Sequence, residues 1–153
     1  MAAGTFQFYD QTPRTLAAGD FDSFTIKAAL VGSGYTPNQD THALWADVSA
    51  QEITGGGTTG YTAGGQTLAS VVLTEITKGY KLASANVQWT AGAATLPGWK
   101  YAVFYVLGTV NGQVNPLFGY FEGESGSTIP ATTDTNNLTL TCPAGGWCDF
   151  TRP

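Results

Sequence analysis

The sequence predicts an all-β protein, a single antiparallel β-sandwich or jelly-roll-like domain with one short helix. Charged residues make up only 11% of the 153 residues, against about 25% in an average globular protein. Twenty glycines, with many threonines and aromatic residues, take the place that Lys, Glu and Leu hold in helical proteins. Glycine and proline also divide most of the chain into segments of about six to ten residues. We therefore expect residues 1–153 to form one β domain.

The first half of the chain contains two expected strands and the predicted helix. Residues 6–9 alternate briefly, so they are either a first strand or part of an extended arm over residues 1–9. Residues 24–31 have the pattern of a strand with a buried face, closed by glycines. In residues 41–48 the apolar side chains recur near helical spacing, with Asp40 or Thr41 as N-cap, which predicts a short helix.

The second half contains the clearest strand and turn signals. Residues 100–107 are apolar almost throughout, so we expect them to be the central, most buried strand. Asn111-Gly112 then predicts a tight hairpin turn, after which the chain returns as the partner of that strand. Residues 142–153 are expected to be a C-terminal loop or tail. The remaining expected strands, outside these groups, are residues 68–75, 80–85, 86–89, 117–122 and 138–142.

The charge pattern argues against two classes of partner. The formal net charge is −5, and the six basic residues are scattered one at a time. No basic stripe is present to neutralise a row of phosphates, so we expect no nucleic-acid binding and no attraction to anionic membrane surfaces. The longest apolar run, residues 101–107, is far shorter than the roughly 20 residues that span a bilayer.

Two groups of side chains have the chemistry of catalysis, but their settings favour structural roles. His42 could join Asp40 or Asp47 in a nucleophile triad, yet no serine stands in a Gly-x-Ser-x-Gly setting. We expect His42 to lie in the first turn of the short helix. Glu122 and Glu124 would lie about 7 Å apart on one strand face, a spacing within the range of inverting glycosidases. Adjacent carboxylates at a strand end more often form a solvated edge, so we expect no enzyme activity.

Metal and cofactor sites are not expected. One histidine and two cysteines cannot close a tetrahedral zinc site without carboxylates. The glycines at residues 55–57, 64 and 65 are not followed by the Gly-Lys-Ser/Thr of a phosphate loop, and they are typical of turns.

Cys142 and Cys148 are a candidate disulfide with two readings. Pro143 and the Gly145-Gly146 pair would reverse the chain between them and bring the two Cα atoms to bonding distance. Outside the cell such a bond would hold Trp147 on a rigid hairpin. In a reducing cytosol the two residues would instead be free thiols.

Several stretches of the sequence form a recognisable series when they are taken in order. They are Phe8-Tyr-Asp10, residues 24–31, Tyr35-Thr-Pro-Asn38, Trp45-Ala-Asp-Val48, Gly60-Tyr-Thr-Ala-Gly-Gly65, Trp89-Thr and Tyr101-Ala-Val-Phe-Tyr105. This series resembles a family of small structural proteins of tailed bacteriophages. The resemblance covers roughly residues 5–122, and the cysteine-bearing tail departs from it. It implies a β-sandwich component of the virion, a cement or decoration protein on the capsid surface that is synthesised in the host cytoplasm.

A decoration protein would contact the major capsid protein and, at local three-fold positions, would assemble as a homotrimer. Aromatic residues at the two ends of the chain suit interface anchors. The alternatives are a receptor- or carbohydrate-binding accessory module of the tail or fibres, and a small glycan hydrolase using the two glutamates. The candidate anchors are Phe6, Phe8, Tyr9, Trp147 and Phe150.

Overall fold

The computed structural model of the chain describes residues 5–17, 19, 21–53, 60–92, 95–123 and 136–151. Most of its regular structure is antiparallel β-strand, which confirms the predicted fold class. The helical elements are α1 (Thr12–Leu16) and the 3₁₀ turns η1 (Phe21–Ser23), η2 (Trp45–Asp47) and η3 (Ser49–Gln51). The strands are β1 (Gln7–Phe8), β2 (Ile26–Val31), β3 (Gln66–Thr67), β4 (Val72–Ile76), β5 (Gly79–Ala83), β6 (Val87–Thr90), β7 (Tyr101–Val106), β8 (Thr109–Val110), β9 (Gln113–Val114), β10 (Leu117–Glu122), β11 (Asn137–Leu140) and β12 (Cys148–Thr151).

The central element of the fold is a five-stranded antiparallel sheet in the order β1-β10-β7-β2-β3. β7 pairs with β2 on one side and with β10 on the other, so the predicted central strand is confirmed. Successive side chains of β7 point to opposite faces of the sheet, and both faces are covered by protein. Ala102, Phe104 and Val106 belong to one core, and Val103 and Tyr105 belong to the other. Burial on both faces explains why the strand is apolar at nearly every position.

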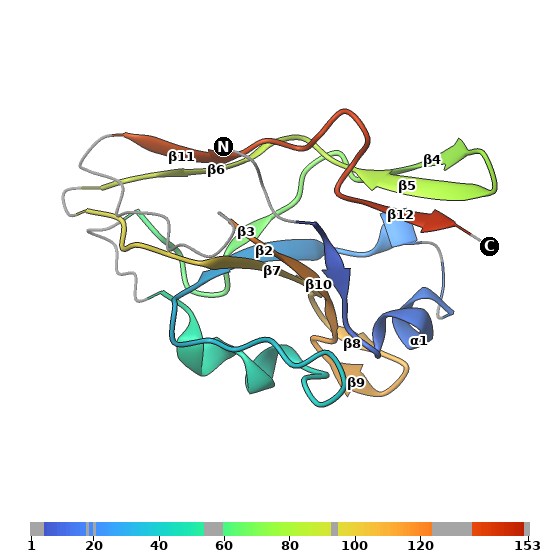
Figure 1. Cartoon of the computed structure of the whole chain (residues 1–153), viewed down its shortest axis with the longest axis horizontal. Helices are drawn as coiled ribbons and strands as arrows, with labels where there is room; N and C mark the ends of the chain where they lie inside the picture. Colours follow the sequence, from blue (N-terminus) through green and yellow to red (C-terminus); the bar gives the residue numbers. More distant parts are fainter. Residues whose placement is uncertain are drawn as a thin grey trace.

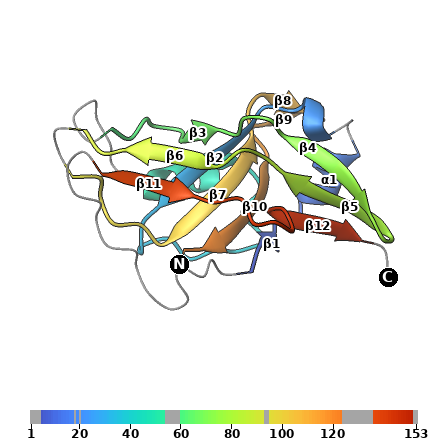
Figure 2. The same ribbon diagram turned by 90° about the horizontal axis from the view of Figure 1, so that it is seen from above.

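The molecule has three layers, with the five-stranded sheet in the middle (Figure 1). Above this sheet lie two smaller ones, β11–β6 and β12–β5–β4, which Figure 2 shows next to each other. They close the larger core, which includes the fully buried Trp89, Trp99 and Phe118. Below the sheet, the segment with η2 and η3 covers the second core through Tyr35 and Val48. The upper sheets and the central sheet form the predicted sandwich.

Two tight turns join neighbouring strands, and the second is the turn predicted at Asn111-Gly112. β4 and β5 are joined through Thr77 and Lys78, and Lys78 has a φ of 66°. β8 and β9 are joined through Asn111 and Gly112, whose φ values are 49° and 77°. Two consecutive residues with positive φ are the signature of a type I′ turn, whose twist matches that of the flanking strands. The Asn-Gly signal therefore marks a short hairpin between the central strand and its partner β10.

A β-bulge in β10 sets the two faces of that strand. The pairing with β7 shifts between Leu117 and Gly119, which leaves Phe118 as the extra residue. Because of this shift, Tyr120 packs against the same core as Leu117, although three residue steps separate them. The bulge also places Gly119 directly against the ring of Phe6, so that a Cβ at this position would lie 2.1 Å from Phe6 Cε1. The bulged strand therefore needs a glycine here.

The predicted helix over residues 41–48 is wrong. Leu44 is extended, with φ −123° and ψ 154°, and forms a β-bridge with Pro116. Trp45 stacks on Tyr105, with ring centroids 4.7 Å apart and planes 10° apart. These contacts hold the apolar residues against the central sheet, so only the 3₁₀ turns η2 and η3 form. The α-helix in the described part of the chain is α1, whose first turn contains Pro13.

Both ends of the described chain belong to sheets. Residues 6–9 contain a strand, one of the two alternatives expected for them, whereas a strand in the C-terminal segment corrects the expected loop or tail. In the N-terminal segment, Gln7 and Phe8 pair with Tyr120 and Gly119 of β10. The predicted tail contains β12, which pairs with β5 from Cys148 to Thr151. Residues 1–4, 152 and 153 lie outside the described part.

The helices among the described residues are too short and too polar to cross a bilayer.

Replacing Gly119 by alanine should destabilise the domain by about 1–3 kcal/mol, because the new methyl group would overlap the Phe6 ring and force it out of the core. Urea denaturation of both proteins would give the difference in free energy of unfolding. Gly145→Ala is the matched control, since nothing lies within 4 Å of that Cβ position, and it should change stability by less than about 0.5 kcal/mol. Equal effects of the two substitutions would contradict the packing argument.

Candidate functional site

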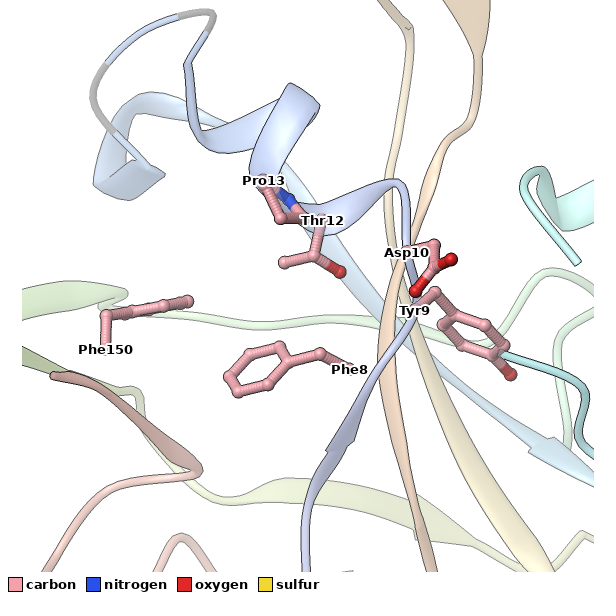
Figure 3. Close-up of a pocket in the computed structure, with 6 residues that line it drawn as sticks. All are labelled: Phe8, Tyr9, Asp10, Thr12, Pro13 and Phe150. Carbon is pink, nitrogen blue, oxygen red and sulfur yellow. The ribbon is translucent and has the colours of Figure 1, made fainter. Parts of the chain in front are cut away.

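A pocket of about 270 Å³ opens where β1, α1 and β12 meet (Figure 3). In Figure 3 the Phe8 and Phe150 rings lie on one side of the hollow and Pro13 on the other. The centroids of the two phenylalanine rings are 5.4 Å apart. The walls are mainly apolar, and the lining contains one carboxylate. The lining residues are Phe8, Tyr9, Asp10, Thr12, Pro13 and Phe150.

Local structure holds each wall of the pocket in place. Phe8 belongs to β1 and lies opposite Gly119 of β10. The Thr12 side chain is buried, and its hydroxyl donates a hydrogen bond to the carbonyl oxygen of Phe118. Pro13 occupies the first turn of α1, where its missing N–H would have no helical partner in any case. The pocket is therefore formed before any partner binds.

The β12–β5–β4 sheet extends this lining onto the surface. Phe150 pairs directly with Tyr80, and Tyr80 pairs directly with Glu75, so the three side chains share one face of the sheet. Leu82, two residues along β5 from Tyr80, points the same way and is fully buried, so this face is the one turned toward the core. Tyr80 lies beyond the core and is 51% exposed. We call the pocket lining together with Tyr80 and Glu75 the aromatic surface.

The predicted N-terminal anchors contribute to the core of the monomer. Phe6 is in ring contact with Phe104 and Phe118, with centroids 5.4 and 5.3 Å apart. Tyr9 is 1% exposed, and its phenol points away from the hollow in Figure 3. Phe8 is half-buried and lines the pocket. Of these three residues, Phe8 alone presents its ring to the pocket.

The predicted C-terminal anchors also differ from one another. Trp147 is 7% exposed and packs on Phe104 and Phe121, while its indole N–H donates a 2.8 Å hydrogen bond to Ser84 Oγ. It is a core residue and does not project from the surface. Phe150 is half-buried and lines the pocket opposite α1.

A hydrogen-bonded chain of two tyrosines and the histidine lies under the second face of the central sheet. The Tyr9 and Tyr35 hydroxyls are 2.7 Å apart, and the Tyr35 hydroxyl is 3.0 Å from His42 Nδ1. Burial raises the pKa of Tyr35 to about 12, and burial with the Tyr35 contact raises the pKa of Tyr9 above its usual range. These hydrogen bonds provide partners for the buried hydroxyl groups of Tyr9 and Tyr35. This is a structural role, and the sequence did not predict it.

The triad considered for His42 is not formed. The imidazole contacts Tyr35 and the backbone N–H of Asn38. The Asp47 carboxylate instead accepts hydrogen bonds from the backbone N–H groups of Ala43 and Leu44, each at 2.9 Å. His42 therefore lies in the loop before η2, not in the first turn of a helix.

The glutamate pair can be placed only in part. Glu122 ends β10, and its Oε1 lies 3.4 Å from Lys100 Nζ in a half-exposed ion pair. Glu124 lies outside the described residues, as does the glycine-rich segment 54–59. Within the described part of the chain, no three His, Cys, Asp or Glu side chains are grouped to hold a metal ion.

Cys142 and Cys148 are free cysteines in the structure, so the candidate disulfide is not formed. Cys148 is buried at the start of β12, and Cys142 is half-buried. Pro143 and Gly146 do close a turn, with the Gly146 N–H donating to the Pro143 carbonyl oxygen at 2.8 Å. Burial, reinforced by the Asp149 carboxylate, raises the pKa of the Cys148 thiol above its usual range.

Sequence reasoning missed five members of the aromatic surface, namely Asp10, Thr12, Pro13, Glu75 and Tyr80. Proline at the start of a helix is a known signal, and Pro13 could have located α1. Tyr80 alternates with Leu82, which indicates a shared face but not exposure. Nothing in the sequence indicated Asp10, Thr12 or the pairing of Tyr80 with Phe150.

Stability should fall as the pH rises from about 10 to about 12. Burial raises the pKa values of Tyr35 and Tyr105 from 10.0 to about 12, so the unfolded chain loses these protons first. In this window the folded state binds more protons than the unfolded state, and raising the pH therefore favours unfolding. Urea midpoints measured across this range, together with tyrosinate absorbance, would test this. A midpoint independent of pH up to about 12 would contradict it.

Thiol counting should distinguish the two cysteines. In the native protein Cys142 should react with a disulfide reagent, while Cys148 should react only after unfolding, because it is buried and its thiolate is disfavoured. When the protein is unfolded without a reducing agent, both thiols should react with the reagent. An intact mass that is lower by two hydrogen atoms, together with a count of zero reactive thiols, would instead establish the disulfide.

Comparison with known proteins adds no relative. No family model, no curated protein and no solved structure matches this chain.

Proposed function

We propose that this chain is a structural virion protein of a tailed bacteriophage, a cement or decoration protein that binds the major capsid protein on the capsid surface. The observation that carries the proposal is the aromatic surface, where the exposed ring of Tyr80 adjoins a preformed apolar pocket. Aromatic residues of this kind are enriched in protein–protein interfaces, and a preformed pocket lowers the entropy cost of binding.

The size of the pocket favours a partner's side chain over a free small molecule. Its volume of about 270 Å³ lies just below the range of about 300–1,000 Å³ that is usual for ligand sites. The lining supplies Asp10 and the buried Thr12 hydroxyl as polar groups, and that hydroxyl already donates to a backbone carbonyl. Such a surface is suited to contact rather than to bond making and breaking.

Among the described residues, the side chains with catalytic chemistry are engaged elsewhere. His42 is hydrogen-bonded to Tyr35, and Glu122 is paired with Lys100. Neither lines the pocket. This supports the proposal of a non-enzymatic role over the hydrolase alternative.

A homotrimer at local three-fold positions of the shell remains part of this proposal. Each copy would bury a modest area against the shell, and symmetry would multiply that contact around the particle. A trimer would also add avidity, because three linked copies release the shell far more slowly than one.

Binding to purified particles tests the proposed function. The protein should co-sediment with virions in a fixed, symmetry-related copy number, and it should rebind particles from which it has been stripped. Size-exclusion chromatography with light scattering would give the oligomeric state. No binding to tail-free capsids, with saturable binding to host-surface glycans, would favour the receptor-binding alternative.

A further inference from the structure

Among the described residues, the charged side chains of the aromatic surface are all acidic. Its ionisable carboxyl groups are Asp10, which lines the pocket, and Glu75, which stands in the row with Tyr80. Of the two lysines in the β4–β5 hairpin, Lys81 belongs to the opposite face and donates to the Ala144 carbonyl oxygen at 3.2 Å, and Lys78 is exposed in the turn. The acidic character of this surface thus matches the net charge of −5 of the whole chain.

The neighbouring arginine is also directed away. Arg14 follows Pro13 on α1, but its guanidinium donates to the Asn111 carbonyl oxygen at 3.0 Å. Asn111 in return donates to the Arg14 carbonyl oxygen at 2.9 Å. These two bonds tie α1 to the β8–β9 turn, so the arginine does not neutralise Asp10.

We propose that the aromatic surface binds a segment of the major capsid protein that combines one apolar side chain with a neighbouring lysine or arginine. The apolar side chain enters the pocket between Phe8, Phe150 and Pro13, and Tyr80 covers it from the sheet. The cation lies against Asp10 or Glu75. This inference rests on the proposed function and names the chemistry of the partner.

Two features of the surface favour such a segment. A volume of about 270 Å³ accommodates one large side chain, which makes a single inserted anchor the natural occupant. Carboxylates at the rim of an apolar site select a cationic neighbour, because a carboxylate on the partner would be repelled on approach. The buried anchor supplies affinity, and the rim charges supply orientation and the rate of association.

Two exposed residues of one sheet provide a matched test of the apolar contact. Tyr80 and Val72 are 51% and 48% exposed, but they lie on opposite faces of the β12–β5–β4 sheet. Tyr80→Ala should weaken binding to stripped particles at least about tenfold, and Val72→Ala should leave it unchanged. Circular dichroism and urea midpoints would establish that both variants fold.

A second pair of variants tests the charge. The double substitution Asp10→Asn with Glu75→Gln should weaken binding at least about threefold and reduce its dependence on salt. Asp149→Asn removes one carboxylate from the opposite face of the same sheet and should change neither quantity.

The outcomes separate this inference from the function on which it rests. Failure of the wild-type chain to bind particles overturns both. Wild-type binding with unchanged affinity in Tyr80→Ala overturns the inference alone, and so does an equal loss in Val72→Ala. Loss of affinity in Tyr80→Ala, with no effect of neutralising the two carboxylates, overturns the assignment of a cationic partner. Competition by a polysaccharide in place of the capsid would likewise overturn it.

Discussion

Burial of β7 on both faces is the constraint on which the rest of the structure depends. A strand with apolar side chains on both sides needs two covers, and each cover is fastened to β7 by aromatic contacts. On one face the Phe104 ring contacts Phe6, Phe121 and Trp147. On the other face Tyr105 is stacked under Trp45. This one strand therefore determines the positions of the elements around it, which are the upper sheets, β1 and the segment with η2 and η3.

The elements that could be predicted from the sequence are those with a local cause. Alternation predicted β6, the Asn111-Gly112 pair predicted its turn, and the continuous apolar run predicted β7. The prediction of a helix over residues 41–48 was wrong, although its apolar side chains recur near helical spacing. Leu44 and Trp45 are held instead by contacts with residues more than fifty positions away in the sequence. Tertiary contacts override local propensity in such short segments.

The aromatic surface could not be predicted for a related reason. Two of its rings, Phe8 and Phe150, were predicted from the sequence as interface anchors. They were predicted as separate anchors at opposite ends of the chain. Only the pairing of β1 with β10, and of β12 with β5, brings them together. The exposure of Tyr80 also depends on where the core stops beneath the sheet, and periodicity carries no information on that point. Conversely, Tyr9 and Trp147 are residue types that are typical of interface anchors, yet both are buried within the fold of the single chain.

The meeting of β1 and β12 links the pocket to the folding of the whole chain. Contacts between segments so distant in sequence carry a large loop-closure entropy, so they consolidate after the local hairpins have formed. Fraying of either terminal strand removes one wall, and a partially folded chain therefore presents no pocket. A ligand seated there binds the native state alone and raises its stability in proportion to the logarithm of ligand concentration over Kd. Occupancy and global unfolding are thereby a single linked equilibrium, in which an attached copy resists heat and proteolysis better than a free one.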